Sequence, residues 1–200
     1  DPGDIALVPD PGYPVYEIGT MFAGGTSYKL DCTRESGWKP NLDAIPEDIA
    51  RKAKILWLNY PNNPTGAVMT RERLAELAAV AERHDLLVAS DEIYDRLVYG
   101  VTHTSFPALA GMRDRTLLLG GFSKAYAMTG WRIGYACGPA DLIGAMRKVH
   151  QYIIMSAPTS AQYAAAYALR HGEAEVQRMV AAYDQRRRLI VDSLNGMGLP

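Results

Sequence analysis

The alternation of short apolar runs with amphipathic segments constrains the fold more than any other feature of this 200-residue sequence. Residues 55–58 and 86–89 are short apolar runs, and such runs predict buried strands. Between them, Thr70 precedes a segment whose apolar residues recur at helical spacing, which predicts a capped helix. Repetition of this order is typical of a mostly parallel sheet with helices on both faces. We therefore expect an α/β fold of this kind.

Further strands and helices are expected along the rest of the chain. The same patterns predict strands at residues 5–8, 26–30 and 115–119, and helices at residues 14–22, 41–51, 140–152, 159–170 and 173–194. Both ends of the sequence have the composition of turns, so we expect the chain to be a piece of a longer protein and the sheet to be incomplete at both ends. The long last helix is of a kind that often leads into a second domain.

Composition and charge argue against several classes of function. A formal net charge of −1 gives no electrostatic reason to expect nucleic acid or an anionic membrane as a partner. The longest apolar runs, such as residues 116–119, fall far short of the ~20 residues that a membrane span needs. The four histidines lack ligand spacing, which argues against a metal enzyme. Cys32 and Cys137 lie far apart and form no CxxC motif, as expected of a protein in the reducing cytoplasm.

Polar, turn-rich segments follow the predicted strands at their carboxyl ends. In open α/β sheets, ligands bind outside these ends. The segments at residues 9–14, 59–66, 90–94 and 120–124 all come directly after a predicted strand. We therefore expect the functional site to be built from them.

Lys124 is the first candidate for a chemical role. It follows a predicted strand and two glycines, and Arg132 lies eight residues further on. Such a lysine is either a solvated loop charge or a nucleophile that forms a Schiff base with a carbonyl group, and a nearby cation favours its free amine. The arginine also offers a planar fork for a phosphate. A P-loop is excluded, because no GxxxxGK[ST] motif is present.

Four more candidates lie in the other strand-end segments. Asp91 ends an apolar run, where a carboxylate needs a partner: a helix or basic residue, or the protonated ring nitrogen of a pyridine cofactor. Tyr94 falls on the same side of a helical turn as Asp91, and its hydroxyl can bond a ligand oxygen. Asn63, within a Pro- and Asn-rich turn, is either a simple turn former or a fixed amide donor. Tyr13, between two prolines, offers a ring that can stack on a flat ligand.

Taken together, these segments resemble the successive motifs of a known enzyme family. The matching segments are Asn63-Pro-Thr-Gly66, Ser90-Asp-Glu-Ile-Tyr94, Ser123-Lys124 and Thr129-Gly-Trp-Arg-Ile-Gly134. In this order they resemble the class I/II, fold-type I pyridoxal-phosphate aminotransferases. The resemblance extends over essentially the whole chain. It is strongest to the prokaryotic aspartate, aromatic, alanine and (N-acetyl-)LL-diaminopimelate aminotransferases.

The resemblance implies pyridoxal 5′-phosphate as the cofactor and Lys124 as the catalytic residue. In the family, the matching lysine bonds covalently to the cofactor and moves a proton between the substrate α-carbon and the cofactor. The residue matching Asp91 pairs with the pyridine nitrogen and keeps it protonated. The residue matching Tyr13 stacks on the pyridine ring.

The remaining cofactor contacts are also implied by the resemblance. Tyr94 and Asn63 match residues that bind the 3′-oxygen, and Arg132 matches a residue that binds the phosphate. The family often has a phosphate-binding serine three positions before the lysine, and that position is Gly121 here. One phosphate contact is therefore expected to be missing or replaced by backbone.

The resemblance also implies a domain organisation and partners. Residues 1–171 match part of the large cofactor-binding domain, and residues 172–200 match a long helix that leads toward a small domain outside this chain. Family members are homodimers that take an amino acid and a 2-oxo acid as substrates in a ping-pong cycle. Their glycine-rich phosphate turn and their arginine for the substrate carboxylate fall outside the matching segment. We therefore expect the segment alone to be inactive.

Three alternative interpretations remain open from the sequence. A pyridoxal-phosphate carbon–sulfur β-lyase would use the same Lys124, Asp91 and Arg132. An aminotransferase-like domain of a transcription regulator would share the fold without the activity. A dinucleotide-binding domain is disfavoured, because no GxGxxG follows the first strand. The amino donor and acceptor cannot be read from these residues.

Overall fold

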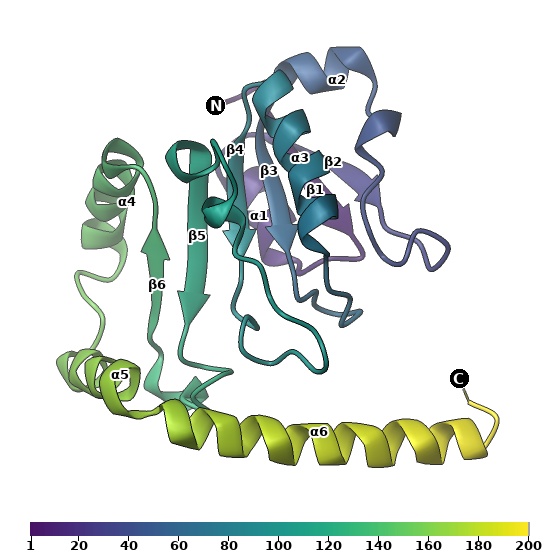
Figure 1. Ribbon diagram of the computed structural model, residues 1–200. Helices are drawn as coiled ribbons and strands as arrows, with labels where there is room; N and C mark the ends of the chain where they lie inside the picture. The colour runs from purple at the N-terminus through teal and green to yellow at the C-terminus, as the bar shows by residue number, and fades with distance from the viewer. Residues whose placement is uncertain (200) are drawn as a thin grey trace.

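The computed structural model describes residues 1–199, whose strands form one six-stranded sheet. The strands are β1 (Ile5–Asp10), β2 (Thr26–Asp31), β3 (Ala53–Asn59), β4 (Leu87–Asp91), β5 (Thr116–Gly121) and β6 (Gly134–Cys137). They lie in the order β2-β1-β3-β4-β5-β6 (Figure 1). Strands β1 to β5 are all parallel to one another, and β6 is antiparallel to β5. The expected α/β fold with a mostly parallel sheet is confirmed.

Helices cover both faces of the sheet. Helix α3 (Arg71–Arg83) begins where the Thr70 side chain accepts a hydrogen bond from the Arg73 amide, as the capping pattern predicts. Its Leu77 is buried in the main core, which also contains Leu56 of β3. Helix α1 (Val15–Phe22) covers the other face, where its buried Tyr16 belongs to a second, smaller cluster. The apolar residues of the central strands are therefore buried on both sides, which explains their uninterrupted runs.

The prediction of a single helix over residues 41–51 is wrong. The segment forms a 3₁₀ turn, η1 (Leu42–Ala44), and then a separate short helix, α2 (Glu47–Lys52). Between them Ile45 is extended, with ψ 122°, because the ring of Pro46 disfavours a helical conformation in the residue before it. Asn41 caps only the first turn, where its side chain accepts a hydrogen bond from the Asp43 amide.

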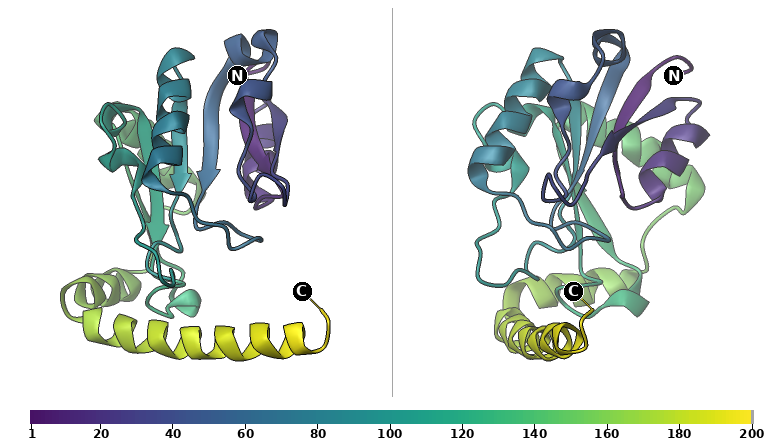
Figure 2. Two further views of the ribbon diagram at one scale, coloured as in Figure 1. Left: turned by 45° about the vertical axis from the view of Figure 1, so that its right-hand side comes forward. Right: turned by 90° about the vertical axis from the view of Figure 1, so that its right-hand side faces the viewer.

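Three helices follow the sheet, as expected. They are α4 (Ala140–Ile153), α5 (Thr159–His171) and α6 (Glu173–Gly196); the expected last segment extends to Pro200, which lies outside the described residues. Figures 1 and 2 show α6 running below the edge at which β4 and β5 end. An ion pair between Arg96 and Glu173 ties its first turn to the segment after β4. Three further 3₁₀ turns are η2 (Phe106–Ala108), η3 (Arg113–Arg115) and η4 (Thr129–Trp131).

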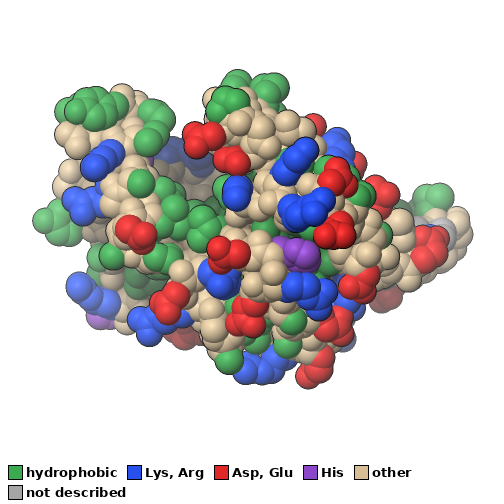
Figure 3. Space-filling model, turned by 90° about the horizontal axis from the view of Figure 1, so that it is seen from above, with side chains coloured by type: hydrophobic (Ala, Val, Ile, Leu, Met, Phe, Trp, Pro, Cys, Tyr) green, Lys and Arg blue, Asp and Glu red, His purple; other side chains and the backbone are tan. Residues whose placement is uncertain are grey.

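The edge at which the parallel strands begin has a mixed surface. Seen from that side, basic and acidic side chains are interspersed with polar and apolar ones (Figure 3). This distribution agrees with the net charge of −1. Within residues 1–199, no helix combines the length and apolar character that crossing a membrane requires.

Candidate active site

A cavity of about 330 Å³ lies at the carboxyl ends of the central strands. Its lining includes all six residues that the sequence singled out: Tyr13, Asn63, Asp91, Tyr94, Lys124 and Arg132. These residues come from four separate segments of the chain. They meet because each segment follows a parallel strand, and the carboxyl ends of parallel strands lie at the same edge of a sheet. The structure therefore has a cavity at the location predicted for the site.

Asp91 is the last residue of β4 and is fixed by several hydrogen bonds. Its Oδ2 accepts a hydrogen bond of 2.7 Å from the Tyr16 hydroxyl, and its Oδ1 accepts one of 3.2 Å from the Ile93 amide. Its backbone carbonyl accepts a third, of 3.1 Å, from Nδ2 of Asn59. Both carboxylate oxygens are thus oriented before any ligand binds.

Tyr16 is a site residue that sequence reasoning missed. Burial raises the pKa of its hydroxyl far above the ordinary value, and the negative charge of Asp91 raises it further. The hydroxyl therefore stays protonated and remains a hydrogen-bond donor to Asp91. Its ring stacks on Trp57 with 4.4 Å between ring centroids. The sequence offered one signal for Tyr16. It lies in the helix that follows Tyr13, on the face of α1 that packs against the sheet.

Asn59 links the turn after β3 to the neighbouring strand. It is fully buried, and its Oδ1 accepts a hydrogen bond of 2.8 Å from the amide of Asn63. The next turn residues are fixed in the same way, because Oδ1 of Asn62 accepts hydrogen bonds from both the amide and the hydroxyl of Thr65. Asn63 is therefore held at the cavity by a turn in which asparagine side chains replace backbone partners. Sequence reasoning found Asn63 but not Asn59.

Lys124 lies between two anchored neighbours. Phe122 and Ala125 are both buried, and α5 packs against this segment. The Lys124 carbonyl accepts a hydrogen bond from the Ala127 amide, which closes a turn around the lysine. Its Nζ lies 5.8 Å from the centroid of the Tyr94 ring. The lysine is therefore presented to the cavity on a short, rigid turn.

Arg132 has a strained backbone at the cavity wall. Its φ and ψ angles of 51° and 52° place it in the left-handed region, which costs about 1–2 kcal/mol for a residue with a side chain. Its Nη1 donates a hydrogen bond of 2.8 Å to the carbonyl of Thr129. The Thr129 hydroxyl in turn donates to the carbonyl of Ser123. Strain of this kind is typical of functional sites.

Gly121 packs closely against its surroundings. A Cβ atom placed there would lie 2.9 Å from Cδ1 of Ile93 and 3.2 Å from Cα of Gly134. Other hydroxyl groups line the cavity nearby, those of Ser123 and Thr129. The backbone at position 121 has little room for an added side chain as it stands.

The comparisons with known proteins agree with this geometry. Residues 1–200 match the family model described as aminotransferase class I and II. The chain belongs to this aminotransferase family. It is 46% identical over 202 aligned residues to the LL-diaminopimelate aminotransferase of Moorella thermoacetica, an alignment that covers 99% of the chain and 51% of the relative. It is 42% identical to a putative aminotransferase, YugH, of Bacillus subtilis, over 100% of the chain and 52% of that protein.

Solved aminotransferase structures share the fold. A single mutant of the Thermus thermophilus aspartate aminotransferase matches with a TM-score of 0.93 and 41% identity, over 99% of this chain and 52% of that one. The aromatic aminotransferase of Pyrococcus horikoshii OT3 matches with a TM-score of 0.92 and 37% identity, over 99% and 54%. The chain thus has the fold-type I architecture. It spans about half the length of the curated relatives it matches.

The cavity fits the cofactor of this family, pyridoxal phosphate. A protonated pyridine nitrogen needs an anionic partner, and Asp91 supplies a carboxylate that is already oriented. A phosphate needs cations and hydrogen-bond donors, and Arg132 and Ser123 line the same cavity. The aldehyde needs an amine, which Lys124 supplies. The Tyr13 ring, 44% exposed, offers a face for a flat ligand.

Proposed function

We propose that the protein to which this chain belongs is a pyridoxal-phosphate-dependent transaminase that moves an amino group from an L-amino acid to a 2-oxo acid by a ping-pong mechanism. The observation that supports this most directly is that Lys124 and Asp91 line one cavity of about 330 Å³ together with Arg132. An amine, an oriented carboxylate and a guanidinium in one cavity match the three charged or reactive parts of the cofactor.

Lys124 has the central role in this proposal. When bound, pyridoxal phosphate supplies an aldehyde that condenses with amines and a ring that takes up electron density from the substrate α-carbon. In our proposal the Nζ of Lys124 would hold the cofactor through its aldehyde carbon, would be released when the substrate amine takes its place there, and would then, as a free amine, carry a proton from the substrate α-carbon to the cofactor. The Lys124 amine can reach only a limited set of positions, because its backbone begins a short turn and the nearby Phe122 and Ala125 are buried. Such fixed placement lowers the entropic cost of proton transfer.

Asp91 binds the pyridine nitrogen in our proposal and keeps a proton on it. A carboxylate that already accepts a hydrogen bond from Tyr16 needs little rearrangement when the ligand arrives. Arg132 binds the phosphate in this proposal, helped by the hydroxyl group of Ser123, a residue that lines the same cavity. This hydroxyl group can take the place of the phosphate contact that Gly121 does not provide.

Tyr13, Asn63 and Tyr94 orient the ring in this proposal. Tyr13 stacks on one face of the ring, and the side chains of Asn63 and Tyr94 bind its 3′-oxygen. Burial raises the pKa of the Tyr94 hydroxyl, with a further contribution from the charge of Asp91. The hydroxyl is therefore a donor rather than an anion near neutral pH.

We also propose that the complete enzyme is a homodimer with a second, small domain that α6 leads into. Large apolar side chains support a partner subunit: Phe22, Tyr152, Met155 and Tyr163 are each more than three-quarters exposed. Val176 is the one buried residue of α6, so most of this helix is available to a further domain. Sedimentation of the full-length protein tests the dimer.

A cytoplasmic location completes the proposal. Cys32 and Cys137 are both free thiols, the first buried and the second exposed. An exposed free thiol is common where thiols are kept reduced and uncommon in secreted proteins. Fractionation of cells that make the protein tests this location.

The decisive experiment is an amino-donor panel on the full-length protein loaded with pyridoxal phosphate. The panel begins with LL-diaminopimelate, aspartate and aromatic amino acids, for which the matched relatives are named. We expect one of these donors to change the absorbance of the bound cofactor and to release its 2-oxo acid. The panel also includes a cysteine thioether, and release of its thiol together with pyruvate and ammonia, in place of transfer, would instead identify a β-lyase.

Substitution of Lys124 by alanine is the largest single test of the proposal. We expect Lys124→Ala to lower amino-group transfer by at least about 10³-fold, because it removes both the nucleophile and the proton carrier. Lys52→Ala, at the opposite edge of the sheet, is the matched control and is expected to leave turnover unchanged. Transfer at the wild-type rate in Lys124→Ala would refute the assignment. Transfer by the 200-residue chain alone would refute the need for a second domain and a partner subunit.

A further inference from the structure

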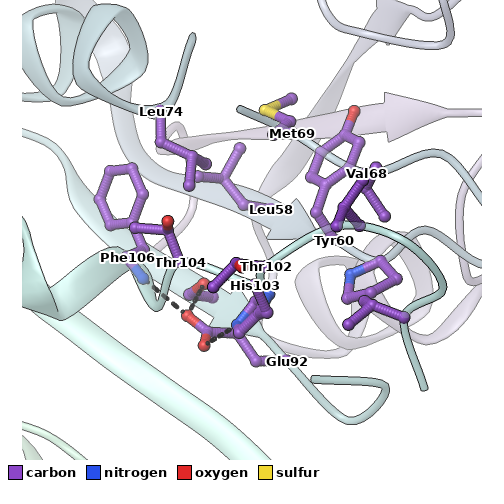
Figure 4. A pocket seen from close by; sticks show the side chains of 14 residues that line it. Leu58, Tyr60, Val68, Met69, Leu74, Glu92, Thr102, His103, Thr104 and Phe106 are labelled. Carbon is purple, nitrogen blue, oxygen red and sulfur yellow. Dashed lines mark hydrogen bonds and ion pairs between the residues drawn. The ribbon is translucent and has the colours of Figure 1, made fainter. Parts of the chain in front are cut away.

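A second carboxylate at the end of β4 points away from the cofactor cavity. Glu92 follows Asp91 directly, and neighbouring residues at a strand end face opposite sides. Its side chain lines a small enclosed cavity of about 20 Å³ between β4, α3 and the 101–106 segment (Figure 4). Glu92 is 6% exposed, so its carboxylate is removed from water. The proposed chemistry has no use for this group, and burying it is costly without partners.

Glu92 joins β4 to residues that come much later in the chain. Its Oε1 accepts hydrogen bonds of 2.9 Å from both the Ser90 hydroxyl and the Phe106 amide. Its Oε2 lies 2.7 Å from Nε2 of His103 (Figure 4). Phe106 is itself fully buried in the main core, so this end of the segment is anchored. One side chain therefore connects the start and the end of the segment 93–105.

The Glu92 backbone adds a connection to β5. Its amide donates a hydrogen bond of 2.9 Å to the carbonyl of Leu119, which lies on the strand that leads to Lys124. Burial opposes ionisation of the Glu92 side chain, but the hydrogen bonds from His103, Phe106 and Ser90 outweigh it and lower its pKa. The group is therefore a buried anion satisfied by its donors, and loss of one donor leaves part of its charge uncompensated.

The segment 93–105, whose two ends Glu92 connects, forms part of the wall of the cofactor cavity. Tyr94 lines that cavity, and Leu97, Val98 and Tyr99 line a neighbouring hollow that also includes Asn63. Local hydrogen bonds shape its beginning, from the Asp95 amide to Glu92 and from the Leu97 amide to Tyr94. The far end depends on the contacts at residues 103 to 106. A hydrogen-bonded cluster on the other face of the sheet thus connects the two ends of the segment that carries Tyr94.

We propose that Glu92 and His103 are positioning residues of the cofactor site: their hydrogen bond fixes the 93–105 segment and, through it, the Tyr94 side chain. The ligand in this inference, pyridoxal phosphate, rests on the proposed function. The clamp, by which we mean the Glu92–His103 hydrogen bond that holds the segment 93–105, rests on the geometry alone. Neither residue contacts the cofactor cavity, so both act through the segment that they hold.

A double-mutant cycle on the full-length protein tests the coupling. We measure the affinity for pyridoxal phosphate, from the absorbance of the bound cofactor, in wild type, His103→Phe, Tyr94→Phe and the double variant. His103→Phe is expected to weaken binding about tenfold in wild type and less than about twofold in the Tyr94→Phe background, because the two residues act as one unit. Fully additive losses would overturn the proposal and leave His103 with a role in stability alone.

Two further variants separate positioning from general damage. His103→Gln places a donor near the position of Nε2 and is expected to restore most of the affinity that His103→Phe loses. His84→Phe is the matched control, because His84 is also partly buried but lies before β4, at the opposite edge of the sheet. Equal losses in His103→Gln and His103→Phe, or a comparable loss in His84→Phe, would contradict the proposal.

Hydrogen exchange on the unloaded protein makes the result independent of the proposed function. Amides within residues 93–102 are expected to exchange faster in His103→Phe than in wild type, while those of β1 and β3 remain unchanged. If the wild type fails to bind pyridoxal phosphate, the proposed function fails, and the exchange comparison still decides whether the clamp exists. Unchanged exchange in residues 93–102 would overturn the clamp.

Discussion

Asp91 and Glu92 are adjacent carboxylates with opposite surroundings. Asp91 opens onto a cavity of about 330 Å³, whereas Glu92 closes one of about 20 Å³. The Tyr16 hydroxyl fixes the Asp91 carboxylate by a hydrogen bond, and Asp91 also lines the cavity, where a ligand can reach it. All the donors of Glu92 come from within the chain, namely Ser90, His103 and Phe106. In our proposal one strand end therefore serves both binding and stability, because its side chains alternate between two faces.

Among the variants that test this comparison, replacement of Asp91 by its amide has the largest expected effect. Asp91→Asn is expected to lower kcat/KM of the full-length enzyme by about 10²–10³-fold, since it removes the charge that balances a protonated ring nitrogen. Its stability should fall by about 1 kcal/mol, because the amide oxygen can still accept the bond from Tyr16 while the amide nitrogen loses the weaker bond from the Ile93 amide.

Glu92→Gln is the counterpart of this variant and should show the reverse pattern. It is expected to lower the free energy of unfolding by about 1–3 kcal/mol, since a neutral amide replaces the charged acceptor of the hydrogen bonds from Ser90, His103 and Phe106. Its kcat/KM should fall by only about tenfold. Urea unfolding and steady-state kinetics measure both quantities. A larger loss of activity in Glu92→Gln than in Asp91→Asn would break the distinction between the two groups.

The next-largest expected effect on activity comes from removing the Tyr16 hydroxyl, which holds the Asp91 carboxylate. Tyr16→Phe removes the hydroxyl that donates to Oδ2 and keeps the ring that stacks on Trp57. We expect kcat/KM to fall by about 10- to 100-fold, the usual worth of a hydrogen bond to a charged group. The raised pKa of Tyr16 keeps the hydroxyl protonated, so the loss should be the same from pH 6 to about pH 9.

The control for Tyr16→Phe is Tyr28→Phe on β2, whose hydroxyl lies outside the cavity lining. This variant is expected to retain wild-type activity. A loss in Tyr16→Phe that varied strongly with pH in the same range would contradict the assigned donor role.

Much of the site was predictable because its residues follow a topological rule. Lys124, Asp91 and Asn63 each come directly after a predicted strand, and parallel strands bring their carboxyl ends together. The elements themselves were predictable from short apolar runs and from the cap at Thr70. Sequence patterns therefore located the cavity, although the chemical roles of its residues remain predictions.

The supporting residues were not predictable for a different reason. Tyr16 meets Asp91 across 75 positions, and Glu92 meets His103 through a loop whose shape no periodic pattern defines. A tyrosine in a helix and a histidine in a loop have many ordinary uses, so their types carry little information alone. The prediction of a single helix over residues 41–51 was wrong because the local effect of Pro46 on the residue before it outweighed the helical pattern.

The smallest effect is the acid dependence of stability that Glu92 contributes. Its pKa is lowered in the folded protein relative to the ordinary value of 4.5, so the folded state binds this proton less tightly than the unfolded state. The stabilisation is therefore complete above about pH 5 and is lost as the pH falls through the lowered pKa. We expect the difference in unfolding free energy between wild type and Glu92→Gln to shrink between about pH 5 and pH 3. Urea unfolding at half-unit intervals measures this difference.

The exposed Glu82 provides the reference for this measurement. Glu82→Gln should leave the unfolding free energy close to wild type across the same range, because water can solvate that carboxylate in both states. A difference between wild type and Glu92→Gln that stayed constant from pH 5 to pH 3 would show that the carboxylate gains nothing from its charge. The donors of Ser90, His103 and Phe106 would then act only as neutral partners. The contrast between the proposed ligand-binding role of Asp91 and the structural role of Glu92 would then reduce to a difference in burial.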